Sequence, residues 1–403
     1  MLPDKHQENR ISISEQKPKV NPYFLVLSGK FKTAKYITLC ILVVFLLTVV
    51  ILFRDEITME NLRYLFKDFE LGDNVDVAAS GDITYDSDMQ VNLALYKGDL
   101  VIAGSSYFYL TDLQGNKRLN EDSMFSNPVV LSGDKYLLVY GLSENTYAVY
   151  NTFSKLYSES FDYPITAAAV SDKGLYAIVT RTAEYRSVVY LYNENFDRIG
   201  AVYKDKYVTD VAFNHDGSEL LIVSLFSQNG SYATEIVNYV PMAEKASSTQ
   251  IIENSMPIQA SYNKDNGYSV IYDNKIEFYD SEFILRNTYQ FDSGVVPITT
   301  MITDNYTAVV YNENIVGNDI KLLMFSTSGD MVLSSIAQGQ PKRIREYGGY
   351  AYILLDGSVC KIRINDGEVK YYPTKRNALD LIVINEESAL VCFSDEATRI
   401  DMK

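Results

Sequence analysis

One continuous apolar segment stands out near the N-terminus. From Tyr36 to Phe53 the chain reads YITLCILVVFLLTVVILF, without a charged residue, and Lys35 and Arg54 flank it. A helix of this length rises about 27 Å, close to the hydrocarbon thickness of a bilayer, whereas a helix buried in a globular domain is not apolar on every face. The following RDEITME offers no small-residue cleavage site. The pattern therefore predicts a transmembrane helix over 36–53.

Short β-rich segments separated by turn residues make up the chain from about residue 81 onward. Proline recurs just before an apolar or alternating segment at Pro128, Pro164, Pro257, Pro297 and Pro341. A proline at the first residue of a strand removes no ladder hydrogen bond. If the unit that begins KYVTDVAFNHDG lacks its proline, five steps cover the interval and the repeat is about 43 residues long, which is typical of a four-stranded propeller blade.

Each repeat divides into four short strands, as in ITAAAVS, LYAIVTR, SVVYLYN and RIGAVY after Pro164. The repeats lie near 89–125, 126–160, 162–204, 206–250, 254–292, 294–337, 339–374 and 376–403. The last has only three strands, and a ring must close to hide two sheet edges. The segment from Val75 to Tyr85 is placed to supply the missing outer strand. The sequence thus predicts an all-β fold, an eight-bladed β-propeller closed by this segment, with seven blades as the alternative.

Charge gives this arrangement an orientation. Residues 1–35 hold seven Lys/Arg against three Asp/Glu, whereas the whole chain has 36 Lys+Arg and 52 Asp+Glu, a net charge of −16. The positive-inside rule places the basic flank in the cytoplasm. We therefore expect a single-pass protein of the cell membrane with a cytoplasmic tail over 1–35 and an extracytoplasmic propeller over 73–403. Between the span and the propeller, 54–72 is expected to be a juxtamembrane helix or linker.

Composition excludes several functions. An acidic chain does not suit nucleic acid, whose phosphates require a basic surface. Three cysteines cannot build a disulfide framework, and two histidines leave little for a zinc site or a histidine-dependent catalytic triad. We predict no metal site and no cofactor.

The chain also resembles a known family. Its basic tail, single apolar run, the segment ENLRYLF at Glu60–Phe66 and its Tyr-rich repeats are similar to membrane-anchored propeller proteins of clostridial Gram-positive bacteria. That resemblance implies a tethered propeller but transfers no activity and no site residue. More broadly the repeats are similar to quinoprotein-like and WD-type propellers. The chain has no Trp, so the WD dipeptide, the Trp-docking repeats of quinone-dependent dehydrogenases and the Trp-ended Asp-box of sialidases are missing, and only the architecture carries over.

Candidate catalytic residues are few. His215 in FNHDGSEL precedes Asp216 and Gly217, a pair that favours a turn, so we expect a turn residue rather than a catalytic base. Cys360 and Cys392 fall in strands of adjacent blades, where buried free thiols are expected although a disulfide is chemically possible. With 52 acidic residues, a glycosidase-like carboxylate pair in the propeller funnel stays open.

Recognition is expected on one face of the propeller, where the connections between second and third strands and those between blades emerge together. Elongated polar and aromatic loops on that face are the natural place for a partner. The predicted partner-binding residues are Tyr185, Arg186, Gln228, Asn229, Tyr232, Asn314 and Asn318 in long second-to-third loops, and Lys342 and Arg343 in an interblade segment.

Two functions remain after these steps. The favoured hypothesis is a scaffold at the cell envelope that binds a protein or a glycan through this face. The alternative is an extracytoplasmic carbohydrate-active hydrolase or lyase with paired carboxylates in the funnel.

Overall fold

The computed structural model describes residues 22–52, 82–314 and 317–403 and divides the chain into two compact units, Met1–Val75 and Asp76–Lys403. The described residues of the first unit form helix α1 (Pro22–Leu52), which includes nearly all of the predicted apolar run and begins well before it. Among the described residues, the structure contains no helix with the length and apolar character needed to cross a bilayer. The predictions for the tail before residue 22 and for the segment 54–72 lie outside the described residues.

In the described part of the second unit, eight antiparallel sheets of four strands follow one another, and we number them as blades 1 to 8. Blade 1 contains β2 (Asn92–Tyr96), β3 (Asp99–Ala103), β4 (Tyr107–Thr111) and β5 (Lys117–Asp122). Blade 2 contains β6 (Pro128–Ser132), β7 (Leu137–Gly141), β8 (Thr146–Tyr150) and β9 (Lys155–Ser160). Blade 3 contains β10 (Ala167–Val170), β11 (Tyr176–Thr180), β12 (Ser187–Tyr192) and β13 (Arg198–Lys204). Blade 4 contains β14 (Tyr207–Phe213), β15 (Leu220–Gln228), β16 (Ser231–Val240), the short helix η1 (Pro241–Ala243) and β17 (Lys245–Glu253).

The remaining blades repeat the arrangement. Blade 5 contains β18 (Pro257–Tyr262), β19 (Tyr268–Tyr272), β20 (Lys275–Tyr279) and β21 (Leu285–Gln290). Blade 6 contains β22 (Thr299–Ile302), β23 (Tyr306–Asn312), β24 (Asp319–Ser326) and β25 (Met331–Gln338). Blade 7 contains β26 (Pro341–Tyr347), β27 (Tyr350–Leu355), β28 (Ser358–Arg363) and β29 (Val369–Pro373). Blade 8 contains β30 (Asp380–Asn385), β31 (Ser388–Cys392), β32 (Glu396–Asp401) and β1 (Ile83–Thr84).

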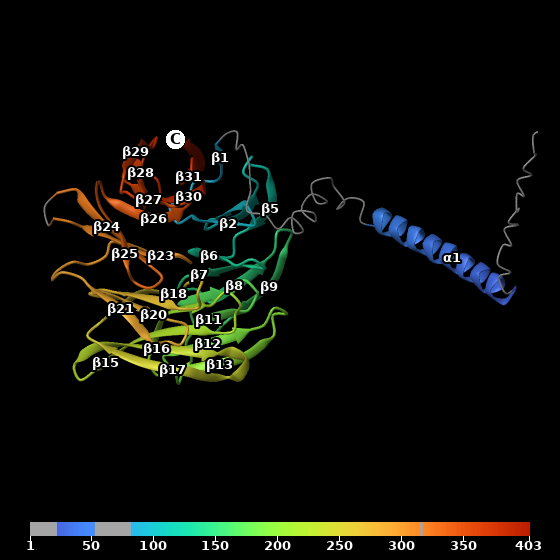
Figure 1. Ribbon diagram of the computed structural model, residues 1–403, viewed down its shortest axis with the longest axis horizontal. Coiled ribbons are helices and arrows are strands. Elements are labelled where there is room, and N and C mark those ends of the chain that lie inside the picture. The colour runs from blue at the N-terminus through green and yellow to red at the C-terminus, as the bar shows by residue number, and fades with distance from the viewer. Residues whose placement is uncertain (1–21, 53–81, 315–316) are drawn as a thin grey trace, which may run out of the picture. The chain divides into compact units, whose positions relative to one another are not determined.

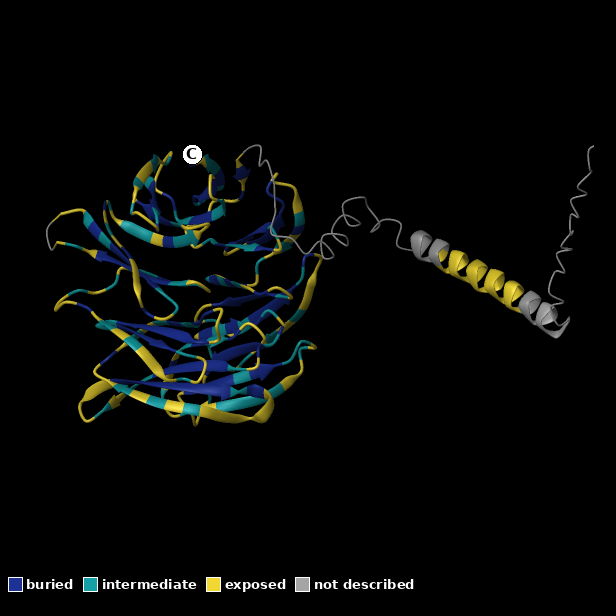
Figure 2. Cartoon of the chain, viewed as in Figure 1, coloured by how far each residue is buried: buried dark blue, intermediate teal, exposed yellow. Residues whose placement is uncertain are grey.

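Strand position explains the hydrophobic pattern. The first strands of neighbouring blades contact one another, so they lie innermost in the ring. The second strands are apolar runs buried along their length, such as LLVYG in β7 and YAIVT in β11, because neighbouring blades cover both faces. The outer strands alternate between exposed and partly buried residues, as KLYSES does in β9. Figure 2 shows this burial within the propeller, with exposure concentrated in loops and outer strands.

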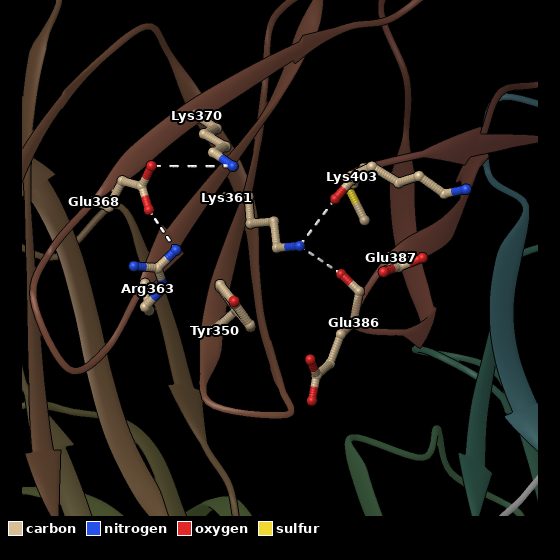
Figure 3. Close-up of a pocket in the computed structure, with 9 residues that line it drawn as sticks. Tyr350, Lys361, Arg363, Glu368, Lys370, Glu386, Glu387 and Lys403 are labelled. Carbon is tan, nitrogen blue, oxygen red and sulfur yellow. Dashed lines mark hydrogen bonds and ion pairs between the residues drawn. The ribbon is translucent and has the colours of Figure 1, made fainter.

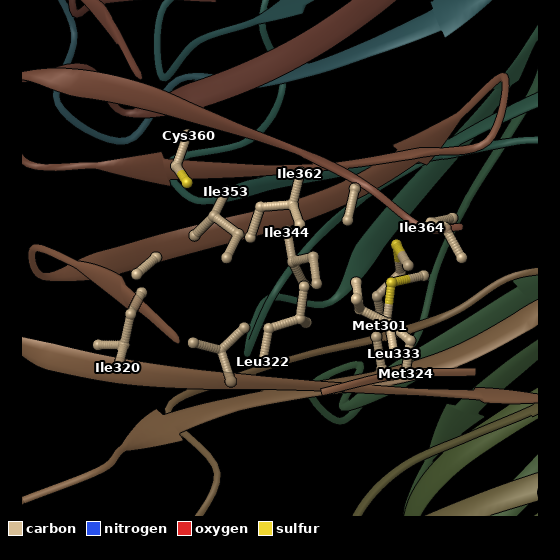
Figure 4. Close-up of a cluster of buried hydrophobic side chains, with 14 of the residues drawn as sticks. Met301, Ile320, Leu322, Met324, Leu333, Ile344, Ile353, Cys360, Ile362 and Ile364 are labelled. Atoms are coloured by element: carbon tan, nitrogen blue, oxygen red, sulfur yellow. The ribbon is translucent and has the colours of Figure 1, made fainter. Parts of the chain in front are cut away.

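The core consists of apolar clusters, each shared by two neighbouring blades, and all eight blade interfaces have one. Between blades 6 and 7, Ile320 and Leu322 of β24 pack against Ile344, Ile353 and Ile362 (Figure 4). Full burial of one such side chain contributes about 1.5–3 kcal/mol. Stability is therefore distributed around the ring.

The ring closes as the sequence predicts. β1 pairs antiparallel with β32, with Ile83 opposite Ala397 and Thr84 opposite Glu396, and it lies beside the C-terminal strands in Figure 1. The Tyr85 hydroxyl donates to the carbonyl oxygens of Phe393 and Glu396, at 2.7 and 2.9 Å. This pairing confirms eight blades rather than seven. The part of the closing segment before residue 82 lies outside the described residues.

Cys360 and Cys392 are both buried and free, as expected. Burial raises the pKa of the Cys360 thiol to about 12, so the thiol stays protonated at neutral pH.

Candidate functional site

We call the face that bears the second-to-third and interblade connections the loop face. Four exposed side chains from blades 3 and 4 meet there, and we call them the tyrosine patch: Tyr185, Arg186, Tyr203 and Tyr207. Their elements explain the position, because Tyr185 and Arg186 lie in the second-to-third loop of blade 3, Tyr203 is near the end of β13 and Tyr207 begins β14. The rings of Tyr185 and Tyr203 are 5.0 Å apart, and the Arg186 guanidinium lies 5.1 Å from the centre of the Tyr207 ring.

The tyrosine patch is unusual among the tyrosines of the propeller. Many of them are buried structural groups, such as Tyr272 and Tyr279, whose hydroxyls donate to one carboxylate oxygen of Glu277 at 3.0 and 2.6 Å. In contrast, Tyr185, Tyr203 and Tyr207 are between 40% and 57% exposed. Tyr185 and Tyr203 thus contact each other and Tyr207 contacts Arg186, while much of the surface of all three rings remains open to solvent.

The next group surrounds the tip of the β15–β16 hairpin. Its two strands are longer than those of the other blades, and Gln228 pairs with Ser231 across a two-residue turn. Asn229 and Gly230 have φ values of 53° and 83°, the geometry that Asn-Gly adopts in tight hairpins. The prediction of a long loop here is therefore wrong, because the extra residues extend the two strands instead. The Asn-Gly pair was the signal in the sequence for a tight turn.

A small cavity of about 70 Å³ lies at this tip, and Gln228, Asn229 and Tyr232 line it together with Glu253 and Asn254. The Tyr232 hydroxyl donates to Asp273 Oδ2 at 3.1 Å, across to blade 5. This hydrogen bond to a carboxylate raises the pKa of Tyr232. The hairpin tip is thus tied to its neighbour through polar contacts.

Asn314 and Asn318 belong to the loop between β23 and β24, and both are exposed. The Asn318 carbonyl accepts the amide of Gly339, at 2.8 Å, so one end of the loop is held by the connection to blade 7.

Lys342 and Arg343 lie in β26 and not in an interblade loop, so that prediction is wrong. Pro341 is the first residue of β26, so Lys342 and Arg343 already belong to the first strand of blade 7. Lys342 pairs with Asp356 at 2.8 Å and donates to the Ala378 carbonyl at 3.1 Å. Arg343 lies 3.9 Å from Asp380. These ion pairs explain how charged side chains are accommodated on an innermost strand.

The nine predicted residues therefore form separate groups on blades 3, 4, 6 and 7, and only the group at Tyr185 and Arg186 joins exposed aromatic side chains. Sequence reasoning missed Tyr203 and Tyr207. Their signal was the short sequence YKDKY, in which only Asp205 and Lys206 connect β13 to β14, so that the tyrosines at the two strand ends lie at the same edge.

On the opposite face, turns between first and second strands carry a charged cluster. His215 lies in such a turn, as expected, with Gly217 at φ 73°. Its Nδ1 is 3.0 Å from Asp172 of blade 3, and its Nε2 is 3.1 Å from Asp304 of blade 6. The hydrogen bond with Asp172 is the main cause of the raised pKa of His215. The sequence did not predict this bridge, because it joins turns that are far apart in the chain.

A larger cavity of about 150 Å³ lies between blades 7 and 8 on this opposite face (Figure 3). Buried Lys361 donates there to the carbonyl oxygens of Glu386 and Met402, at 2.6 and 2.9 Å, and its ammonium lies 4.3 Å from the centre of the Tyr350 ring. Arg363, Lys370 and Lys403 and the carboxylates of Glu368, Glu386 and Glu387 complete a lining of mixed charge. Lys361 fastens the last strands of the chain to blade 7.

Two carboxylates on innermost strands bear on the enzyme alternative. Asp210 accepts the amides of Val211 and Ala260, both at 2.9 Å, and burial raises its pKa to about 6. Asp380 accepts the Leu381 amide at 2.7 Å and lies 3.0 Å from Arg345. Both carboxylates are thus engaged in hydrogen bonds or ion pairs with other groups of the protein.

Residues 73–402 match the model of a family of unknown function, DUF5711. The chain belongs to this family. A comparison with curated proteins found no similar sequence.

Solved structures share the fold at low identity. BamB from Moraxella catarrhalis is 12% identical with a TM-score of 0.52 over 80% of this chain and 98% of its own. The C-terminal WD40 domain of Sif2 is 13% identical with a TM-score of 0.55, over 80% and 100%. Sqt1 from Chaetomium thermophilum, solved with the N-terminus of ribosomal protein L10, is 11% identical with a TM-score of 0.56, over 80% and 100%. The similarity to WD-type propellers is confirmed at the level of the fold.

Proposed function

We propose that this protein is a membrane-anchored binding module whose propeller holds a protein partner on the loop face, outside the cell. The observation that carries the proposal is the tyrosine patch. Tyr and Arg are the residue types that dominate binding energy in protein interfaces. Here they are gathered on one edge of two neighbouring blades and are open to solvent.

The contacts within the tyrosine patch favour tight binding. Tyr185 lies against Tyr203, and Arg186 lies over Tyr207, so the four side chains are partly ordered before a partner arrives. Ordering a flexible side chain on binding costs about 0.5–1.5 kcal/mol, and a preordered surface avoids part of that cost. A planar ring with a polar hydroxyl also suits a protein surface of mixed polarity.

Proteins of similar fold agree with a binding role. Sqt1 was solved with the N-terminus of another protein bound to it. That observation concerns Sqt1 alone, but it illustrates that a propeller of this fold can hold the terminal segment of another protein.

The membrane anchor in this proposal rests on the sequence. The run from Tyr36 to Phe53 has no charged residue, and the basic flank precedes it. Its one hydroxyl within the last two turns, on Thr48, donates to the Val44 carbonyl at 2.8 Å, which satisfies a polar group in an apolar setting. The positive-inside rule then puts the propeller on the outer side.

The proposal is tested by changing Tyr185, Arg186 and Tyr207 together to Ala in the full-length chain. Partners are captured by cross-linking in intact membranes and compared with those of the wild type. We expect the main wild-type partner to be lost, because truncation of each interface anchor costs about 2 kcal/mol or more. The melting temperature should stay nearly unchanged, since exposed substitutions alter stability by about 0.5 kcal/mol or less each.

A matched control carries three alanines on the opposite face, at Lys173, Lys264 and Tyr347. All three side chains belong to turns between first and second strands or to the adjoining strand end. The control should retain the partner. Loss of the partner in the control, with retention in the loop-face variant, would place recognition on the other side of the propeller.

A further inference from the structure

The outer strands form the rim of the propeller, and one of them differs from the rest. An outer strand has an unpaired edge, and native proteins protect such edges with charged residues, Lys above all, with Pro, or by keeping the strand very short. In this propeller the outer strands β5, β9, β13, β17, β21 and β29 each contain Lys or Arg. β1 is only two residues long.

β25 has none of these protections. It runs for eight residues, MVLSSIAQ, without a charge and without proline. Met331, Val332 and Ile336 are all exposed, Ile336 to 54%. On its inner side β25 pairs with β24 along its length, so the strand itself is firmly placed.

The direction of the free backbone groups can be read from one hydrogen bond. The amide of Gln338, at the end of β25, donates to the Tyr371 hydroxyl of blade 7 at 2.8 Å instead of to β24. Alternate residues of a strand direct their amide and carbonyl groups to the same edge. Ile336 and Ser334 therefore present theirs to the rim, and Val332 follows at a β-bulge where the register with β24 shifts by one residue.

We propose that a second copy of this chain pairs with this edge, β25 against β25, antiparallel about a two-fold axis at Ser334. Antiparallel self-pairing is the arrangement that a two-fold axis permits, and two-fold dimers are the commonest oligomers. With Ser334 opposite its symmetry mate, Val332 of each copy lies opposite Ile336 of the other. Favourable cross-strand side-chain pairs of this kind stabilise a sheet.

Two features favour a second copy over an unrelated peptide. The pairing about Ser334 is self-complementary on the exposed face, with two identical Val–Ile contacts and no charged side chain between them. It also joins two four-stranded sheets into one of eight strands, with the rim amides of both copies satisfied by each other.

The test uses the full-length chain purified in mild detergent, with Cys40→Ser to remove the exposed thiol; Cys360 and Cys392 are buried. Ser334→Cys should form a disulfide-linked dimer under mild oxidation, because the two-fold axis brings the residue opposite itself. The matched control is Ser158→Cys, an exposed serine in β9, whose strand carries Lys155 and Glu159. It should stay monomeric on a non-reducing gel.

A second variant, Ser334→Lys, places a charge at the centre of the edge. Light scattering should give the mass of two chains for the wild type and of one chain for the variant. The melting temperature of the variant, measured at a dilution where the wild type is also monomeric, should equal that of the wild type. A monomeric wild type, a dimer that survives Ser334→Lys, or equal cross-linking at Ser158→Cys would each overturn the proposal.

Discussion

Two ionisable residues, Asp210 and His215, should make the stability of this propeller depend on pH. Asp210 sits on the innermost strand of blade 4, where a register shift after Val208 turns its carboxylate toward the amides of Val211 and Ala260. Burial disfavours its charged form and raises its pKa to about 6 despite these two hydrogen bonds. The pKa of His215 on the opposite face is also raised, but the main cause there is the hydrogen bond with the carboxylate of Asp172.

The first prediction concerns Asp210. Its pKa in the folded state is above the unfolded value, so its contribution to stability is fully present below about pH 4 and is lost as the pH rises through about 6. The loss amounts to at most about 3 kcal/mol for a shift of about two units. Asp210→Asn removes this titration. The free energy of unfolding of the wild type minus that of the variant should therefore fall between pH 4.5 and pH 8, and parallel profiles would contradict the assignment.

The second prediction concerns His215, whose protonated form gains from Asp172 and Asp304. Because its folded-state pKa is raised, the stabilisation is complete below about pH 6.5 and disappears as the pH rises through the folded value. Denaturant melts should show a larger loss for His215→Gln at pH 6 than at pH 8.5. An equal loss at both pH values would mean that the ring contributes only by packing.

At the scale of elements, the repeat determined most of what could be predicted. A period of about 43 residues and a proline at or just before five of the eight first strands were enough for eight blades, and the missing outer strand of the last blade identified β1. Two errors have physical causes. The β15–β16 strands extend where other blades have loops, and the basic residues of β26 are neutralised by Asp356 and Asp380, which no local pattern reveals. The tyrosine patch was only half predicted, because Tyr203 and Tyr207 come from the end of β13 and the start of β14, where blade 3 leads into blade 4.

The third prediction tests closure at β1. Ile83 is buried between blades 8 and 1, next to Leu93 and Leu390, whereas its neighbour Thr84 is exposed. Ile83→Ala should lower the free energy of unfolding by about 2–5 kcal/mol through the lost contacts and the cavity. Thr84→Ala, in the same strand, should change it by about 0.5 kcal/mol or less. Similar small effects in urea melts of both variants would show that the ring is held shut elsewhere.

At the scale of the whole molecule, the chain combines a basic N-terminal tail and an apolar run with a large acidic propeller. In the proposed topology the basic tail of residues 1–35 stays in the cytoplasm, because Lys and Arg cluster before the apolar run. The stability of the propeller is distributed over eight similar blade interfaces, each with its own apolar cluster. The loops that these blades carry differ in length from blade to blade and are the natural place for recognition.

The fourth prediction concerns that topology. Protease added to the outside of intact, accessible cells should digest the propeller and leave a fragment that contains residues 1–35, detected with an N-terminal tag. The same protease added to permeabilised cells should remove the tag as well. Protection of the propeller in sealed cells would contradict the proposed orientation.

The central claim, recognition through the loop face, is tested most directly by site-specific photo-cross-linking. A photoreactive phenylalanine analogue is placed at Tyr207 in the tyrosine patch or at Tyr347 on the opposite face, each in the full-length chain in its native membrane. Both positions are exposed tyrosines, so the probe replaces a side chain of similar size. We expect one dominant protein adduct from the probe at Tyr207 that is absent with the probe at Tyr347 and disappears when Tyr185 and Arg186 are changed to Ala. An adduct from Tyr347 alone would contradict it.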